Sequence, residues 1–165
     1  VHIRRDHRDL HLALRRQRQM CIRDRVESVF ASLPLVQQVW LYGDSYQPHL
    51  VAVAVPQPDT FAAFASRILQ KTVKHDDQTA MQSAVNDSKV VEAVLREFIK
   101  LGKKQRLGTL EQMRALKLRL DPFSPENGLM TPTMKVKRQE AAKILKGDLD
   151  ELYRRQPYDL NDVKL

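Results

Sequence analysis

An unbroken apolar run of six residues, Leu50 to Val55, is the feature that most restricts how this sequence can fold. It ends at Pro56 and is far shorter than the roughly 20 apolar residues that a membrane-spanning helix needs. A short run that is apolar at every position is typical of a strand covered on both faces of its sheet. Residues 38–42 (QVWLY) predict a second strand, and turn-forming residues lie between the two. The sequence therefore predicts a long-looped hairpin formed by residues 38–43 and 50–56.

Apolar residues recur at helical spacing in four other stretches. The predicted helices are residues 25–32, a helix that begins at Asp59 or Thr60, a helix that begins at Asp87 or Ser88, and residues 140–154. In the last of these, the spacing predicts burial of Ala141, Leu145, Leu149 and Leu152. The polar stretch 72–84 is expected to be a loop or a frayed helix.

A third strand is predicted near residues 114–120, where Leu116, Leu118 and Leu120 alternate with two cationic residues. The alternation indicates that one face of this strand meets water. The chain has 165 residues, 42% of them hydrophobic, which suffices for one domain with a core. The order of the elements predicts an α+β fold with a short, mainly antiparallel sheet and packed helices.

Positive charge is concentrated at the beginning of the sequence. Residues 1–25 carry eight arginines and three aspartates. More than half of the formal net charge of the whole chain, which is +8, therefore arises in this segment. Three interpretations compete: a basic arm for nucleic acid or anionic lipid, a transit peptide, and translated sequence foreign to the domain. We favour the third, because residues 19–25 (QMCIRDR) resemble translated sequencing-adapter sequence. We therefore expect a non-native or disordered segment at 1–25, a domain at 26–157 and a polar tail at 158–165.

Few residues suit a metal or a familiar catalytic constellation. One cysteine excludes an internal disulfide and a cysteine zinc site, and the five glycines form no phosphate-binding cluster. His49 and His75 have no partner at ligand spacing, so no metal site is expected. No signal peptide is visible, and we expect an intracellular protein that is not secreted and has no transmembrane segment.

The segment Thr131 to Arg138 (TPTMKVKR) differs from the rest, because it places three cations within four residues after a stiff Thr-Pro-Thr turn. If it is extended, Met134 and Val136 would anchor one side while Lys135 and Lys137 project together on the other. A lysine held in this way is a movable positive charge that suits a phosphate. The alternative is a solvated basic turn before a helix, and composition by itself favours that alternative.

Residues 131–138 resemble the C-terminal lysine motif of the AMP-forming acyl-CoA synthetases, in its long-chain fatty acid form. The stretch 39–45 (VWLYGDS), followed by 50–56 (LVAVAVP), is similar to the strand–loop–strand that opens the C-terminal domain of that family. The resemblance covers about residues 26–157. It implies a small C-terminal domain that rotates on a hinge between two steps of a reaction.

The resemblance implies a ligase that first joins a fatty acid and ATP into an acyl-adenylate and then transfers the acyl group to coenzyme A. Lys135 matches the catalytic lysine of the motif, which contacts carboxylate and phosphate oxygens in the first step. Thr131 and Thr133 would shape the loop, Arg138 would anchor it, and Lys137 would face solvent.

The matching hairpin-loop motif, Gly43, Asp44 and Ser45, is expected to be mainly structural. The larger N-terminal adenylation domain of the family has no counterpart in this sequence, so we expect a fragment that is inactive alone. The complete enzyme would use ATP, coenzyme A and Mg²⁺, and none of them is expected to bind this fragment.

Two alternatives remain open at this stage: a small basic nucleic-acid-binding module and a non-catalytic docking module. Nucleic acid is disfavoured, because little net charge remains once residues 1–25 are removed. For the ligase we expect a cytoplasmic location or peripheral attachment to the endoplasmic reticulum or peroxisome. Lys164 and Leu165 match the end of a peroxisomal Ser-Lys-Leu signal, but Val163 does not match its first position.

Overall fold

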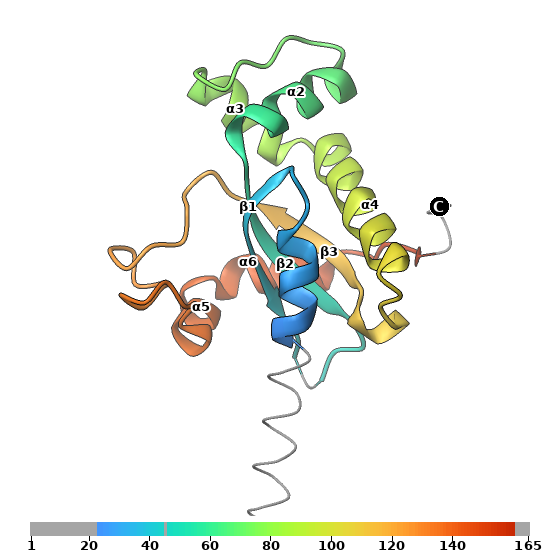
Figure 1. Cartoon of the computed structure of the whole chain (residues 1–165), viewed down its shortest axis with the longest axis vertical. Coiled ribbons are helices and arrows are strands. Elements are labelled where there is room, and N and C mark those ends of the chain that lie inside the picture. The colour runs from blue at the N-terminus through green and yellow to red at the C-terminus, as the bar shows by residue number, and fades with distance from the viewer. Residues whose placement is uncertain (1–22, 45, 161–165) are drawn as a thin grey trace, which may run out of the picture.

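The computed structural model describes residues 23–44 and 46–160. Ser45, the tail from residue 161 and nearly all of the Arg-rich segment therefore lie outside the described residues. The described chain begins with a helix over residues 23–31, called the first helix here. The remaining elements are β1 (Val36–Tyr42), β2 (Leu50–Pro56), α2 (Pro58–Leu69), α3 (Gln78–Asn86), α4 (Ser88–Lys104), a 3₁₀ turn η1 (Thr109–Glu111), β3 (Met113–Leu118), α5 (Arg138–Ile144) and α6 (Lys146–Arg154) (Figure 1).

The three strands form one mixed sheet in the order β1-β2-β3. β1 and β2 form the predicted antiparallel hairpin, in which Trp40 lies opposite Val53. β3 lies parallel to β2, with Lys117 opposite Val53. The α+β class is confirmed, but the expectation of a mainly antiparallel sheet is wrong for β3. Helices α2 to α4 carry the chain from β2 to β3, and a connection of that length is what a parallel pair requires.

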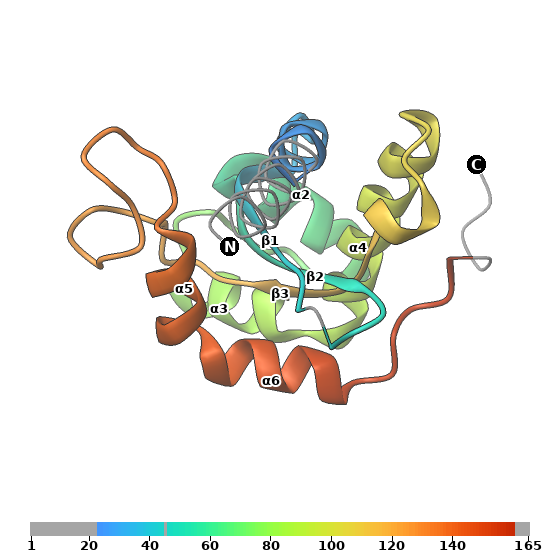
Figure 2. The same ribbon diagram turned by 90° about the horizontal axis from the view of Figure 1, so that it is seen from below.

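β2 is covered on both faces, as its unbroken apolar sequence predicts. Ala52 and Ala54 belong to the larger hydrophobic cluster, which the first helix and α2 to α4 help to build. Val51, Val53 and Val55 belong to a second cluster, with α5, α6 and the loop before them. Figure 2 shows α6 on one side of the sheet and the first helix and α2 on the other. We call the side covered by the first helix and α2 to α4 the helical face, and the side covered by α5, α6 and the loop before them the loop face.

Side-chain caps explain where two helices begin. The Asp87 carboxylate accepts hydrogen bonds from the backbone N–H groups of Lys89 and Val90, so α4 starts where the sequence predicts. Asp77 caps α3 in the same way by accepting from Ala80. The polar stretch 72–84 is thus partly helical.

The predicted cap of α2 is wrong. Asp59 and Thr60 lie inside the first turn, because the helix already begins at Pro58 with Gln57 as its N-cap. Proline suits the first helical position, since its φ is preset and its missing N–H has no intrahelical partner there.

The predicted helix 140–154 is two helices, α5 and α6, that meet at Leu145. All four apolar residues predicted to be buried are buried (Ala141, Leu145, Leu149 and Leu152). Leu145 follows α5 and is the N-cap residue of α6, and Gly147 lies two residues further on, in the first turn of α6. Glycine weakens a helix interior by about 1 kcal/mol relative to alanine. The break therefore falls at a weak point of the helix and preserves the apolar face.

The face of β3 that carries Lys117, which the sequence predicts to meet water, is only partly exposed to it. The Lys117 ammonium lies 3.5 Å from a Glu151 carboxylate oxygen and 3.9 Å from one of Asp148, both on α6.

Among the described residues, no helix combines the length and apolar character that crossing a membrane requires.

Candidate functional site

The chain between β3 and α5 extends to one side of the sheet (Figure 1), and Asn127 organises its first half. The Asn127 Oδ1 accepts from the backbone N–H groups of Ser124 (3.0 Å) and Leu129 (3.2 Å), and its Nδ2 donates to the Pro122 carbonyl (2.7 Å). Gly128 follows with φ of +74°, in the left-handed region that glycine adopts without strain. This half of the loop is therefore a tight local turn.

Gln38 of β1 fixes that turn to the sheet. Its Oε1 accepts from the Phe123 N–H at 2.6 Å, and its Nε2 donates to the Phe123 carbonyl at 3.1 Å. The Phe123 ring is 2% exposed and packs in the cluster on the loop face. One side-chain amide thus satisfies both backbone groups of a loop residue that carries a buried ring.

The second half of the loop, which we call the lysine loop (residues 131–137), is pinned by its own threonines. The Thr131 N–H donates to the Lys135 carbonyl at 2.8 Å, and the Thr131 hydroxyl accepts from the Lys135 N–H at 3.1 Å. The Thr131 and Thr133 hydroxyl oxygens lie 2.9 Å apart. At the base of the loop, the Lys137 N–H donates to the Leu129 carbonyl at 2.8 Å. The hydroxyls therefore hold the backbone around the lysine.

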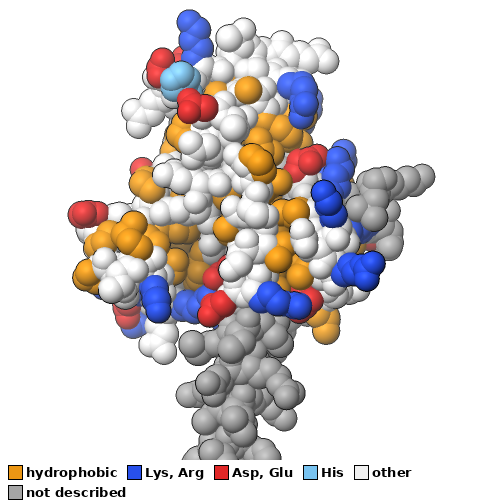
Figure 3. Space-filling model, in the orientation of Figure 1, with side chains coloured by type: hydrophobic (Ala, Val, Ile, Leu, Met, Phe, Trp, Pro, Cys, Tyr) orange, Lys and Arg blue, Asp and Glu red, His pale blue; other side chains and the backbone are white. Residues whose placement is uncertain are grey.

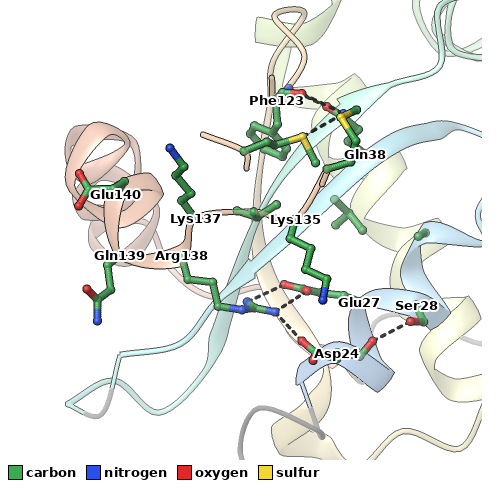
Figure 4. A pocket seen from close by; sticks show the side chains of 15 residues that line it. Asp24, Glu27, Ser28, Gln38, Phe123, Lys135, Lys137, Arg138, Gln139 and Glu140 are labelled. Atoms are coloured by element: carbon green, nitrogen blue, oxygen red, sulfur yellow. Dashed lines mark hydrogen bonds and ion pairs between the residues drawn. The ribbon is translucent and has the colours of Figure 1, made fainter. Parts of the chain in front are cut away.

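The predicted placement of the apolar and basic residues in the lysine loop is partly wrong. Val136 is half-buried against the loop-face cluster, but Met134 is 62% exposed. Met134 has φ of +60°, which interrupts the strand-like alternation and turns its side chain outward. Lys135 and Lys137 point apart in Figure 4, so they do not project together.

The Lys135 side chain is exposed. Within residues 23–44 and 46–160, its ammonium group forms no ion pair or hydrogen bond, whereas its backbone N–H is bonded to Thr131. This ammonium group is therefore uncommitted within its own domain, although the backbone that carries it is fixed.

Arg138, the first residue of α5, joins the lysine loop to the first helix. Its Nη2 lies 2.7 Å from Glu27 Oε2 and 2.8 Å from Asp24 Oδ1, and its Nη1 lies 3.0 Å from Glu27 Oε1. Burial alone would lower the pKa of the Arg138 guanidinium, but the hydrogen bonds and charges of Glu27 and Asp24 outweigh it and raise that pKa. Arg138 is thus a permanent cation tied to two carboxylates.

An open pocket of about 880 Å³ lies between the lysine loop, the start of α5, the first helix and β1 (Figure 4). Its charged lining residues include Lys135, Arg138, Glu27 and Asp24. The pocket places the Lys135 ammonium group, which has no partner among the described residues, beside a cluster of one guanidinium and two carboxylates. Lys137 is also exposed and lines the pocket, but it points away from Lys135 (Figure 4). Such an arrangement offers a mobile positive charge at Lys135 to an anionic group brought from outside the domain.

The hairpin-loop motif lies elsewhere. Neither Gly43 nor Asp44 lines this pocket. A Cβ at Gly43 would come within 2.6 Å of Leu50 Cδ2, and the Asp44 N–H donates to the Tyr153 hydroxyl at 3.2 Å. Gly43 thus packs closely within the hairpin, and the Asp44–Tyr153 hydrogen bond ties the hairpin to α6.

The described residues include no group of three His, Cys, Asp or Glu side chains arranged to hold a metal ion. His75 lies 2.7 Å from Asp76 and 3.7 Å from Asp59, and all three side chains are exposed by more than half. These are contacts between solvent-exposed polar side chains.

Four residues that build the site were not among those singled out in the sequence: Asp24, Glu27, Gln38 and Asn127. Asp24 falls in the segment set aside as foreign, yet it contacts Arg138, and its neighbour Arg25 forms an ion pair with Glu111 at 2.7 Å. Spacing does not show which polar residue of a helix or strand will bond a distant group, so only Asn127, beside a glycine in a turn, carries a local signal.

No family model matches the chain. The chain is 39% identical over 131 residues to the peroxisomal acyl-CoA ligase 891 of Penicillium roqueforti. It is 34% identical over 130 residues to long-chain-fatty-acid–CoA ligase 5 of Mus musculus, and 30% identical over 130 residues to ligase 6 of Homo sapiens. Each match covers 79% of this chain and 18% of the relative, so the chain spans about a fifth of the length of these relatives.

Solved adenylation domains share the fold. The A domain of a carboxylic acid reductase from Segniliparus rugosus, solved with AMP and a co-purified carboxylic acid, has a TM-score of 0.62 and 25% identity over 79% of this chain and 17% of that one. The corresponding domain from Mycobacterium chelonae has a TM-score of 0.60 and 22% identity over 80% of this chain and 18% of that one.

The resemblance inferred from the lysine motif is confirmed, because the homologues are acyl-CoA and long-chain fatty acid–CoA ligases. The nucleic-acid alternative is not favoured. On the face seen in Figure 3, lysine and arginine side chains are interspersed with acidic ones and form no single basic patch.

Proposed function

We propose that this chain, a homologue of the long-chain fatty acid–CoA ligases over 79% of its length, supplies the mobile C-terminal domain of such an enzyme and delivers Lys135 to its active site. The observation that carries the proposal is the state of Lys135. Its side chain is exposed, its backbone is pinned by Thr131, and its ammonium group has no partner among the described residues. That state suits a cation whose partner belongs to another domain or to a substrate.

Lys135 would act in the first of two steps. A fatty acid carboxylate attacks the α-phosphate of ATP, pyrophosphate leaves, and negative charge redistributes over the carboxylate and phosphate oxygens. An ammonium group placed against those oxygens stabilises the transition state, and one such donor changes the rate about 10²–10³-fold. Thr131 and Thr133 shape the loop, Arg138 anchors it, and Lys137 faces solvent.

Coenzyme A would then displace AMP in the second step, after the domain has turned away. Lys135 has no role in that step, because the acyl-phosphate anhydride bond whose formation it assists has already formed. Loss of a cation that acts only in the first step should slow that step alone, whereas loss of a residue needed for folding should slow both steps.

The partner of this domain would be a larger adenylation domain that binds ATP and the fatty acid. Mg²⁺ usually bridges the phosphates of its nucleotide. The described residues hold no cluster of three acidic, histidine or cysteine ligands, so they do not fit a metal site, and we assign the ion to the partner domain.

Residues 26–157 form the proposed domain, and the described part of the first helix extends it to residue 23 through the contacts of Asp24 and Arg25. We place the complete enzyme in the cytoplasm or peripherally on the endoplasmic reticulum or peroxisome. The support for the last site is that two relatives from Penicillium are named peroxisomal.

The test uses a complete enzyme, which we call the grafted ligase: the Penicillium roqueforti acyl-CoA ligase with its matching segment replaced by that of this chain. We expect Lys135→Ala to lower the rate of acyl-adenylate formation about 10²–10³-fold. Thioester formation from supplied acyl-adenylate should keep its rate. Lys143→Ala, which removes a lysine that is 73% exposed on α5, is the matched control and should change neither step. Equal loss in both steps after Lys135→Ala would contradict the proposal.

A further inference from the structure

Glu27 lies where three elements meet. Its carboxylate accepts from both terminal nitrogens of Arg138, at 2.7 Å and 3.0 Å, and from the backbone N–H of Leu41 at 2.9 Å. Glu27 belongs to the first helix, Leu41 to β1, and Arg138 to the start of α5. One side chain thus links the first helix, the edge of the sheet and the base of the lysine loop.

The Glu27–Arg138 pair is stronger than an ordinary surface ion pair. The Glu27 and Arg138 side chains are 19% and 28% exposed, so water screens their interaction only in part. Two parallel N–H···O bonds between a guanidinium and a carboxylate fix direction as well as distance. Arg138 is therefore held in one orientation relative to the first helix.

Arg138 is close enough along the chain to transmit that orientation to Lys135. Only two residues lie between them, and the N–H of one of these, Lys137, donates to the Leu129 carbonyl at 2.8 Å. The Thr131 N–H closes the loop on the Lys135 carbonyl at 2.8 Å. A rotation of Arg138 would therefore move the base of the loop, and with it the ammonium group at the tip.

Glu27 fits the role of an anchor better than Asp24, the other carboxylate on Arg138. The Asp24 side chain is 63% exposed and contacts the guanidinium through a single oxygen at 2.8 Å. Of these two carboxylates, only that of Glu27 also accepts a hydrogen bond from the sheet, from the backbone N–H of Leu41.

We infer that Glu27 is a positioning residue for Lys135: it holds the base of the lysine loop so that the ammonium group reaches the reacting oxygens in the adenylation step. This inference rests on the proposed function. A displacement of about 1 Å at a reacting group can cost about 10²-fold in rate, so an anchor outside the substrate site can control catalysis.

The decisive variant is Glu27→Gln. The amide oxygen still accepts from Leu41, but the negative charge and one of the two acceptors for Arg138 are lost. In the grafted ligase we expect the rate of adenylate formation to fall about 10-fold or more, toward the limit of about 10²-fold. The KM for ATP and the rate of thioester formation should stay unchanged. Arg25→Gln removes another ion pair of the same helix, to Glu111, and should leave both steps unchanged.

A double variant tests whether Glu27 acts through Lys135. When Lys135→Ala is already present, Glu27→Gln should cause no further loss of adenylate formation, because the anchor acts only through the lysine. Arg138→Lys keeps the charge but loses the two-pronged geometry, and we expect it to be impaired in the same step.

Hydrogen exchange on the whole 165-residue chain provides a readout that needs no enzyme. We expect Glu27→Gln to speed exchange of the Thr131, Lys135 and Lys137 amides, whereas Arg25→Gln should not.

The outcomes separate the two ideas. If Lys135→Ala leaves adenylate formation intact, the proposed function is wrong. If Lys135→Ala abolishes that step but Glu27→Gln does not slow it, slows both steps equally, or slows it further in the Lys135→Ala background, the positioning role is wrong while the proposed function stands. Unchanged exchange in the lysine loop of Glu27→Gln would also overturn the inference.

Discussion

The two faces of the sheet are built on different principles. The helical face is covered by regular helices whose apolar side chains interlock, for example Phe30 of the first helix and Phe98 of α4, with ring centroids 5.5 Å apart and nearly perpendicular. The loop face is covered by α5, α6 and a long irregular loop that is fixed by polar contacts, such as those of Gln38 with Phe123. Apolar burial therefore secures the fold, and hydrogen bonds place the candidate site.

The comparison also explains why the lysine loop belongs to the loop face. A helix-packed surface has little room for an exposed, fixed backbone turn, whereas a polar-anchored loop holds its backbone and leaves a side chain free. Lys135 has such a place, because its backbone is bonded twice to Thr131 and its side chain is exposed.

The largest expected effect tests the helical face. Phe98→Ala removes a side chain that is fully buried and packed edge-on against Phe30. We expect the free energy of unfolding, measured with urea, to fall by about 3–5 kcal/mol. Lys100→Ala, on the exposed side of the same helix, should change it by less than about 0.5 kcal/mol. A loss at Phe98 no larger than at Lys100 would mean that this face does not carry the stability.

The next effect tests the loop face. Gln38→Ala leaves the N–H and carbonyl of Phe123 without their partners in a partly buried position. We expect a loss of about 1–3 kcal/mol in the free energy of unfolding, with faster hydrogen exchange confined to residues 121–130. If exchange rises evenly over both faces instead, the loop is not held by this separate polar contact.

A pair of glycines gives a smaller and sharper contrast. Gly128 has φ of +74°, so Gly128→Ala should cost about 1–2 kcal/mol of stability through backbone strain. Gly147 is in α6, and a Cβ there would meet nothing within 4 Å. Gly147→Ala should therefore stabilise the protein, by about 0.5–1 kcal/mol, in the same urea measurement. A destabilised Gly147→Ala would show that the break between α5 and α6 requires glycine.

The smallest expected effect is a pH dependence on the loop-face side. Burial, and secondly the charge of Arg114, lower the pKa of His49 from its ordinary 6.5, and neither ring nitrogen has a hydrogen-bond partner among the described residues. Below about pH 6.5 the unfolded chain then binds more protons at this residue than the folded one, so stability falls as the pH falls. We expect His49→Gln to reduce the slope of unfolding free energy between about pH 7 and pH 5. An unchanged slope would exclude His49 as its source.

Much of the helical face could be predicted from the sequence, because apolar spacing reports burial directly. The sequence predicts a helix that begins at Asp87 or Ser88, and α4 begins at Ser88 with Asp87 as its cap and with Val94, Leu95 and Phe98 buried. It did not show that β3 runs parallel to β2, since a strand pattern is the same in either direction. The apolar spacing also does not reveal the break at Leu145, because both helices keep the same apolar stripe.

The candidate site was predicted in part. The Thr-Pro-Thr turn and its lysine were found from composition and resemblance, but the outward turn of Met134 depends on a backbone angle that no spacing rule encodes for a non-glycine residue. Glu27 and Gln38 escaped for a different reason. Their partners, Arg138 and Phe123, lie 111 and 85 residues away in the sequence, so only the folded chain brings each pair together.

The central claim is that the Lys135 ammonium group is uncommitted in its own domain, and the most direct test is its rate of modification by an amine-selective reagent on the whole chain. Lys143, 73% exposed, and Lys117, 25% exposed and placed near two carboxylates of α6, provide the fast and slow references. We predict that peptide mass spectrometry finds Lys135 modified as fast as Lys143. A rate as slow as that of Lys117 would show that the group is held within the domain and would contradict the account.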